Sequence, residues 1–454
     1  MSIDVSAPSA GPGEASSVLR LLGKIGALAA PLALGACVLS VFNLGTLALL
    51  SRYDQGPALH TVSLLQPAFF LIIALMEGLG ITNQVFAART KRAFSQHGLR
   101  GSSWRLAIIG LGLLFLLTAL AYGAERVFGS RAGSWEPVLA DLPYAILSMA
   151  AFVVFEVYHG ALRGRGRIFL GLVPFALAVT VTLAVMYGLL TQYDLGLYAV
   201  LLGNFVGPLL LLPVIIYLVH REARGGEPMS TRALYGQLRG LLAGVGGPVF
   251  FSILVASASA AVIFPVLDRF GKEEVSAFLV IIRLRVAFMI PAVAAGSAIA
   301  ILVNQCFDEK LKHGSSGRIL AVGLPVIFGF YLLATLALAF APGMAIDTIV
   351  PQQTAALNVW SLRLLLLLSP TFFLLPCAVC MQIVLEQVGD GLKVLVLTIV
   401  VEVATVCALL FALQDEQSIE FVCYVLIASA GVTFIAFLVR ILMLSRKWEA
   451  SRAV

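Results

Sequence analysis

The chain has 454 residues, of which 60% are hydrophobic and only 12% are charged. A soluble domain carries roughly twice this share of charged residues, so the composition excludes a soluble globular protein and indicates a polytopic membrane protein. The net charge of +6 resides in loop clusters of Lys and Arg, a distribution that does not indicate a nucleic-acid-binding protein.

The two ends of the chain and one internal segment are polar. Residues 1–18 are rich in Ser, Ala, Pro and Gly, which is typical of a disordered segment. They lack the charged-then-apolar order of a cleavable signal peptide, so we expect the first apolar segment to be retained. Residues 221–237 are expected to link an N-terminal lobe (19–220) to a C-terminal lobe (238–445), followed by a tail (446–454).

Twelve apolar segments each meet the length of about 20 residues that a membrane-spanning helix requires. The sequence therefore predicts an all-α protein with twelve transmembrane helices. In chain order the segments are 24–51, 58–89, 103–124, 137–162, 168–191, 195–219, 238–266, 274–306, 318–341, 354–385, 393–413 and 418–443.

Lys and Arg alternate strongly between the two sides of this predicted topology. The side that holds both termini carries 22 of the 30 basic residues, and the opposite side carries five. By the positive-inside rule, both termini are expected in the cytoplasm and the chain in the cytoplasmic (inner) membrane.

Landmarks of the first half return in the second half. Asn83-Gln84 closes the second apolar segment, and Asn304-Gln305 closes the eighth, 221 residues later. Ala30-Pro31 and Gly247-Pro248 lie early in the first and seventh segments, 217 residues apart. Internal repeats of this kind are typical of transporters that work by alternating access between two lobes.

Acidic residues inside the apolar segments are candidates for cation coupling, because a charge in a membrane span is costly. Glu77 is the first candidate, since it lies near the middle of the second segment, next to Gly78 and Gly80, with Gln84 seven residues later on the same helical face. The alternative is a structural glutamate that pairs with Arg283 or Arg285. Glu402, at the centre of the eleventh segment, is the second candidate, with an internal ion pair or hydrogen bond as its alternative.

Other polar residues in the segments are candidates for substrate binding. Arg283 and Arg285 are spaced i, i+2, so they cannot share one helical face, and Arg283 could bind an anionic group. Neutral hydrogen bonds to a substrate could come from Asn43, Thr46, Gln84, Gln305 and Gln382, although each could equally join helices.

Three stretches resemble the MATE (multidrug and toxic compound extrusion) exporters of the MOP flippase superfamily. They are FFLIIALMEGLGITNQVFAAR (Phe69–Arg89), VSAFLVIIRLRVAFMIPAVAAGSAIAILVNQ (Val275–Gln305) and ALRGRG (Ala161–Gly166). The resemblance implies two pseudo-symmetric six-helix lobes around a V-shaped central cleft. It also implies export of a small organic compound driven by a proton or sodium gradient, of which we expect the proton.

The chain departs from that family at its coupling acids. The resemblance implies acids in helices 1, 5, 7 and 10, but residues 25–51, 168–193, 240–267 and 356–385 contain neither Asp nor Glu. We therefore expect a neutral, zwitterionic or anionic substrate rather than a dicationic dye.

Two other classes compete with this reading. A flippase for a lipid-linked sugar or oligosaccharide shares the architecture, but its cleft is expected to be more basic. An integral-membrane enzyme would need a polar catalytic cluster, and no pair of histidines has metal-ligand spacing. We expect no enzyme activity, no metal and no cofactor beyond the coupling ion. A small organic substrate and the lipid bilayer are the expected partners of a monomeric protein.

Overall fold

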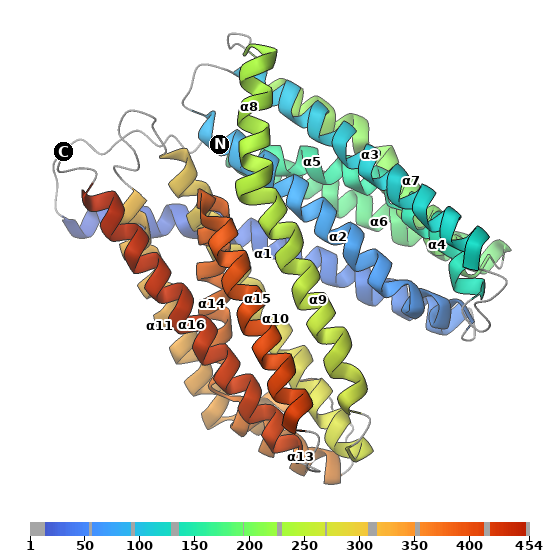
Figure 1. Cartoon of the computed structure of the whole chain (residues 1–454), viewed down its shortest axis with the longest axis vertical. Helices are drawn as coiled ribbons and strands as arrows, with labels where there is room; N and C mark the ends of the chain where they lie inside the picture. The colour runs from blue at the N-terminus through green and yellow to red at the C-terminus, as the bar shows by residue number, and fades with distance from the viewer. Residues whose placement is uncertain are drawn as a thin grey trace. The chain divides into compact units, whose positions relative to one another are not determined.

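The computed structural model describes residues 14–53, 57–91, 96–128, 136–193, 195–224, 229–267, 270–306, 316–349, 355–412 and 418–450. Across these ranges the regular structure is helical and contains no strand (Figure 1). This follows from the apolar runs, because a helix satisfies every backbone hydrogen bond within itself and so tolerates a lipid surrounding.

The first half of the chain supplies six membrane crossings. The fourth crossing is broken at Met149 into two helices, and the other five are continuous. In chain order the helices are α1 (Glu14–Tyr53), α2 (Pro57–Arg89), α3 (Gln96–Phe128), α4 (Glu136–Ser148) with α5 (Ala150–Gly164), α6 (Ile168–Tyr193) and α7 (Leu197–Glu222).

The second half begins where the sequence analysis expects a linker. Residues 231–241 form α8 (Thr231–Leu241), which is capped by the Ser230 hydroxyl accepting from the Ala233 amide at 3.3 Å. Leu234, Leu238 and Leu241 are its buried residues, and their spacing places them on one helical face. The amphipathic pattern of this polar segment, rather than its overall polarity, decides that it is a helix.

The remaining crossings follow without long connections. The π-helix η3 (Leu242–Gly246) joins α8 to α9 (Gly247–Leu267). Then come α10 (Lys272–Gln305), α11 (Ser316–Phe340), the short α12 (Pro342–Ile349), α13 (Ala355–Leu368), α14 (Thr371–Leu385), the π-helix η4 (Glu386–Asp390), α15 (Gly391–Ala412) and α16 (Ile419–Ala450).

The apolar helices of the described ranges form twelve membrane crossings, as predicted. Eleven helical stretches are long and apolar enough to cross a membrane, and the longest of them, Thr371–Phe411, has 41 residues. A helix of that length would be about twice as long as the hydrocarbon core is thick. Gly389 divides the stretch, because its φ of 110° is outside the helical range. The part before Gly389 therefore completes the tenth crossing, which begins with α13, and the part after it is the eleventh crossing.

The chain forms two compact units. One contains residues 34–254, and the other contains the described part of residues 4–33 together with 255–454. α1 passes from the second unit to the first close to Pro31, and α9 passes from the first to the second after Leu254. Helices 1 and 7 of the repeat are thus the two helices that belong to both units.

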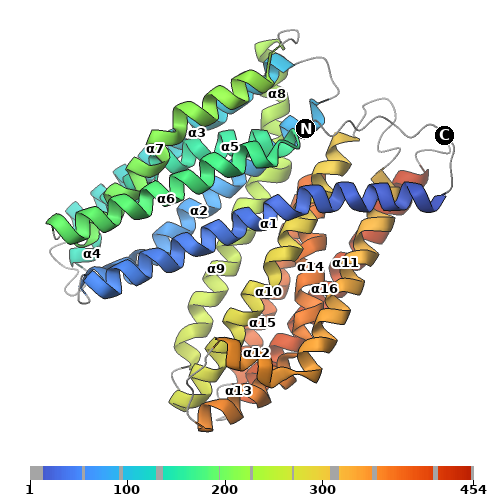
Figure 2. The same cartoon turned by 180° about the vertical axis from the view of Figure 1, so that it is seen from behind.

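Each unit has its own apolar core. In the first unit, α2 packs along α5 and α6 packs along α7, and both pairs can be followed in the two opposite views (Figure 1, Figure 2). Phe86, Phe155 and Tyr158 are among the fully buried side chains there. In the second unit, α14 lies between α10 and α16, with Phe372 at the centre of an apolar cluster.

α1 begins at Glu14, within the segment 1–18 that the sequence predicts to be disordered. The rest of that segment, residues 1–13, lies outside the described residues. The predicted C-terminal tail, 446–454, overlaps the last residues of α16, which ends at Ala450.

Candidate functional site

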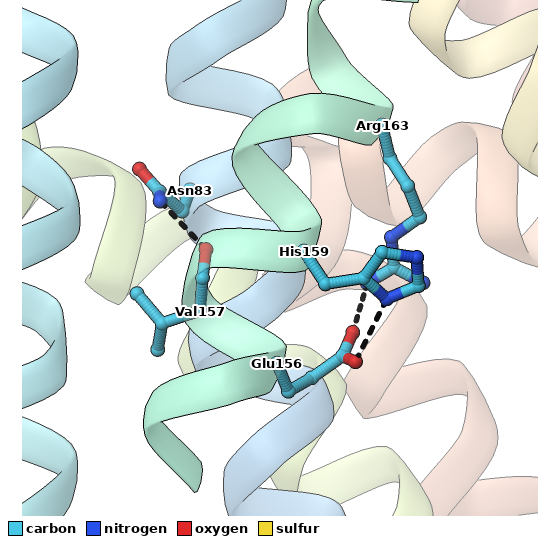
Figure 3. Close-up of polar contacts among 5 residues, drawn as sticks. All are labelled: Asn83, Glu156, Val157, His159 and Arg163. Atoms are coloured by element: carbon cyan, nitrogen blue, oxygen red, sulfur yellow. Dashed lines mark hydrogen bonds and ion pairs between the residues drawn. The ribbon is translucent and has the colours of Figure 1, made fainter. Parts of the chain in front are cut away.

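A buried ion pair lies near the end of the fourth crossing. The Glu156 carboxylate accepts from Arg163 Nη2 through Oε1, and its Oε2 lies 3.1 Å from His159 Nδ1. All three residues belong to α5, and Figure 3 shows the imidazole and the guanidinium converging on the carboxylate. Because buried charges in a membrane span are usually paired, the contact explains how α5 carries both.

The spacing of the three residues produces this convergence. Positions i, i+3 and i+7 of a helix share one face, so Glu156, His159 and Arg163 are stacked over two turns. His159 is fixed from its other side by the ring of Phe175 on α6, which stacks on it with centroids 5.4 Å apart and an interplanar angle of 10°. The carboxylate therefore meets two side chains with little freedom to move away.

Glycines allow α2 to approach this face of α5. A Cβ on Gly80 would come within 3.0 Å of Glu156 Oε1 and 3.3 Å of Arg163 Nη2. A Cβ on Gly160 would overlap the carbonyl oxygen of Gly80, and one on Gly164 would overlap that of Gln84. Small residues are the usual means by which membrane helices pack closely, and here they place α2 directly over the ion pair.

Glu77 joins this cluster from α2. It is half-buried, and it interacts electrostatically with Glu156 and with Arg163. Besides His159, the cluster contains two carboxylates and one guanidinium. The structure thus brings the predicted coupling residue Glu77 together with a second acid and a base that the sequence analysis did not assign to the site. We call Glu77, Glu156, His159 and Arg163 the α2–α5 charge cluster.

Asn83, the first landmark of the repeat, has a structural environment. Its Nδ2 donates to the Val157 carbonyl at 2.8 Å (Figure 3) and to Ser103 Oγ at 2.9 Å, and its Oδ1 accepts from Ser102 Oγ at 2.9 Å. These bonds join α2 to α3 and α5. The landmark recurs because the fold needs it in each half.

Gln84 and Gln305, two of the predicted substrate-binding residues, lie inside their own units. Gln84 is 2% exposed and Gln305 is 3% exposed. Asn304, the neighbour of Gln305, donates from Nδ2 to the Gln387 carbonyl at 3.1 Å and so ties α10 to η4. In each half, the Asn of the Asn-Gln pair therefore joins the end of the second crossing to the end of the fourth crossing of that half.

The second unit holds a buried acid that the sequence analysis missed. Glu386 is 5% exposed, and its Oε1 accepts from Gln382 Nε2 at 3.0 Å. It lies one residue beyond the predicted tenth segment, 354–385, because helical backbone continues through η4 as far as Gly389. The predicted substrate-binding residue Gln382 is thus in contact with an acid.

Glu402, the second predicted coupling residue, is half-buried on α15. The Ser259 side chain on α9 forms a hydrogen bond with it. This hydrogen bond directs Glu402 at the seventh crossing.

The remaining candidates differ in exposure. Asn43 on α1 is exposed, whereas Thr46 is buried and donates to Met186 Sδ at 3.7 Å. Arg283 on α10 is exposed, whereas Arg285 is half-buried with its Nε shielded and without a hydrogen-bond partner. The two arginines point to different surroundings, as their i, i+2 spacing predicts.

The turn that follows the fourth crossing recurs after the tenth with reversed charge. Gly166 (φ 76°) and Gly389 (φ 110°) occupy the left-handed region in the two turns. When the two halves are aligned on these glycines, Arg163 corresponds to Glu386 and Arg167 corresponds to Asp390. Arg167 Nε lies 3.1 Å from Glu222 Oε1 on α7, and Arg440 Nη2 on α16 lies 2.8 Å from Asp390 Oδ1. Each turn is tied to the last helix of its half by an ion pair, but the signs are exchanged.

Among the described residues, no group of three or more His, Cys, Asp or Glu side chains could hold a metal ion. The polar chemistry of these helices rests instead on carboxylates, guanidinium groups and amides.

These features define a polytopic membrane protein with twelve crossings in an internally repeated chain, with acids buried in its spans. The fold is similar to that of solved MATE transporters of the MOP superfamily. A multidrug resistance MATE transporter in an outward-facing conformation matches 97% of this chain over 99% of its own length, with a TM-score of 0.80 and 19% identity.

Two further solved structures agree. The MATE transporter VcmN of Vibrio cholerae in its bent form matches 96% of this chain and 99% of its own, with a TM-score of 0.80 and 17% identity. A MOP superfamily transporter from Pyrococcus furiosus, described as having a binding pocket of reverse polarity, covers 97% of this chain and 100% of its own, with a TM-score of 0.76 and 20% identity. No protein-family model and no curated protein sequence matches the chain. The resemblance predicted from sequence is thus confirmed at the level of the fold.

Proposed function

We propose that this protein is a secondary active exporter of a small organic compound, driven by a cation gradient across the cytoplasmic membrane. The fold of MATE transporters supports the class. The observation that carries the mechanism is the α2–α5 charge cluster, in which Glu77 adds a second carboxylate beside the Glu156–Arg163 ion pair.

The charge balance of this cluster suits a proton. Two carboxylates beside one guanidinium repel each other and leave one negative charge that a bound cation can neutralise. A proton on Glu77 would remove the repulsion and leave the Glu156–Arg163 pair intact. Loss of that proton would restore competition between the two acids for Arg163. Glu77 is accordingly the coupling residue, and Glu156 holds Arg163 in place beside it.

Glu402 is the second coupling candidate. It reaches Ser259 on α9, and α9 is one of the two helices that pass between the compact units. A change in the charge of Glu402 would act directly on a helix whose two ends belong to different units. This position gives Glu402 a route to conformational change that does not need the α2–α5 charge cluster.

We infer that the substrate is neutral, zwitterionic or anionic. Of the candidate substrate-binding residues, Arg283 is the exposed cation and Asn43 the exposed amide, so a carboxylate or phosphate on the substrate would find a partner at Arg283. The Pyrococcus furiosus transporter of similar fold, with its pocket of reverse polarity, supports a substrate class outside the dicationic dyes. A flippase for a lipid-linked sugar or oligosaccharide remains the second candidate, favoured by the same exposed Arg283.

Proton uptake in proteoliposomes tests the proposal. Vesicles of the wild type, loaded with an internal pH dye, should acidify or alkalinise when an organic substrate gradient is imposed, and an imposed pH gradient should drive the substrate. Glu77→Gln should reduce proton-coupled flux by about tenfold or more, because the neutral amide cannot carry the proton. Glu273→Gln, at an exposed position at the start of α10, is the matched control and should transport normally.

Three outcomes would change the proposal. Flux driven by a sodium gradient at equal pH would assign sodium as the coupling ion. Unchanged proton coupling in both Glu77→Gln and Glu402→Gln would remove both coupling assignments. A membrane-envelope defect in cells lacking the protein, without any change in their sensitivity to toxic compounds, would favour the flippase.

A further inference from the structure

The turn after α5 carries a buried guanidinium that the α2–α5 charge cluster does not use. Arg165 is only 6% exposed, and its Nε and Nη2 are shielded without a hydrogen-bond partner in the structure. Arg163, two residues earlier, is paired with Glu156, and Arg167, two residues later, is paired with Glu222. Arg165 interacts with Glu222 only electrostatically, so two guanidinium groups share one carboxylate.

Burial of this kind is unfavourable for a cation. Desolvation lowers the pKa of Arg165 to about 10, with Glu222 acting in the opposite direction. The side chain is therefore still charged at neutral pH. Because a buried charge without hydrogen-bond partners costs several kcal/mol, the folded protein would gain stability from an anion that reached this guanidinium.

The repeat shows that the turn itself does not require an arginine here. The residue directly before the left-handed glycine is Arg165 in the first turn and Val388 in the second, since Gly166 and Gly389 have the same backbone role. Val388 is also buried, at 9% exposure. A valine thus satisfies the same backbone position, which indicates that the charge of Arg165 serves a purpose other than the folding of the turn.

The turn lies at a membrane surface. Arg165 falls between the spans Val138–Gly164 and Ile168–Tyr193, on the side where Lys and Arg are concentrated and which the positive-inside rule assigns to the cytoplasm. Phosphate groups of anionic phospholipids gather at that surface, and basic sites between helices there are suited to bind them. A guanidinium also matches phosphate geometrically, because its parallel N–H groups can donate to two oxygens.

We propose that Arg165 is the centre of a phosphate-binding site for an anionic phospholipid headgroup of the cytoplasmic leaflet. The shielded Nε and Nη2 of Arg165 are its donors. Binding requires the Arg165 side chain to turn toward the headgroups, a movement that ends its unfavourable burial. Glu222 then remains as the partner of Arg167 alone.

Lipid binding to the full-length protein tests this site. The purified wild type in detergent is titrated with short-chain phosphatidylglycerol, with short-chain phosphatidylcholine and, separately, with inorganic phosphate, while native mass spectrometry counts bound molecules. We expect the wild type to bind phosphatidylglycerol about tenfold or more tightly than phosphatidylcholine, as a charge-assisted hydrogen bond predicts. In Arg165→Val and Arg165→Gln, the affinity for phosphatidylglycerol should fall to that for phosphatidylcholine.

Arg221→Gln is the matched control, because Arg221 is an exposed arginine at the end of α7 on the same side of the protein. It should retain the preference of the wild type. Saturable binding of inorganic phosphate that depends on Arg165, without any preference for phosphatidylglycerol, would keep the phosphate site and assign it to a free anion. Equal retention of phosphatidylglycerol by the wild type and Arg165→Val would overturn the proposal, as would a wild type that prefers neither anion over phosphatidylcholine.

Discussion

Gly80 on α2 lies directly against the carboxylate of Glu156 on α5, so that a Cβ at position 80 would come within 3.0 Å of Oε1. The ion pair inside the membrane and the close packing of these two helices are therefore one structural feature. A side chain at position 80 would separate the helices or displace the carboxylate from Arg163.

Gly160→Ala should be strongly destabilising. Its methyl group would overlap the backbone carbonyl of Gly80, and backbone cannot move aside as a flexible side chain can, so we expect a loss of about 1–3 kcal/mol or more. Thermal unfolding of the purified protein measures it. Gly188→Ala in α6 is the control, since nothing lies within 4 Å of a Cβ there. A variant Gly160→Ala as stable as the wild type would show that α2 and α5 pack less closely than described.

Removal of one partner from the Glu156–Arg163 pair should cost more than removal of both. Either Glu156→Gln or Arg163→Met leaves a charge buried without its partner, a change worth about 3–5 kcal/mol. The double variant should recover part of the loss. Denaturant unfolding of the wild type, the two single variants and the double variant gives the coupling energy between the two side chains. Additive losses would mean that the two side chains act independently.

The Asp390–Arg440 pair should tolerate exchange of its charges. Asp390→Arg alone places two guanidinium groups together and should lower stability by about 1–3 kcal/mol, because like charges then meet in a partly buried site. Asp390→Arg with Arg440→Asp should restore much of it, since the Arg167–Glu222 pair already shows the opposite polarity in the first half. Thermal unfolding of single and double variants decides this. If the double variant is no more stable than the single, the sign at this turn is fixed.

Ser259→Ala should alter transport in the same direction as Glu402→Gln, but more weakly. The serine supplies a hydrogen bond to the carboxylate, which the alanine removes while the acid remains. We expect about a two- to fivefold change in proton-driven flux for the serine variant, in keeping with the modest energy of hydrogen bonds between membrane helices. Flux measured in proteoliposomes at several external pH values separates the two variants. Ser252→Ala, about two turns earlier on α9, is the control.

The sequence predicted the number of crossings well, because a run of about 20 apolar residues has few alternatives to a membrane helix. It predicted the segment 231–237 less well, because polarity was taken as the sign of a linker, whereas the leucines on one face of α8 make a helix.

The candidate site was predicted in part. Glu77 was selected from its depth in the second segment, but its neighbours Glu156 and Arg163 come from α5, and only the packing of Gly80 and Gly160 brings them together. Glu386 lies just outside the predicted tenth segment, 354–385, because no residue type signals that helical backbone continues as a π-helix up to Gly389. Exposure could not be read from sequence either, so Gln84 and Asn43 were treated alike although one is buried and the other exposed.

The reversed ion pairs at the two turns bear on how the halves of this chain diverged. If both halves descend from one duplicated ancestor, the Arg167–Glu222 and Asp390–Arg440 pairs began with the same polarity, and one of them has since inverted. A single substitution at either position would have set like charges against each other, so the inversion had to pass through a weakened intermediate or through the loss of the pair. On that descent, the turn would have kept its glycine and its ion pair with the last helix of the half while the sign of its charge changed.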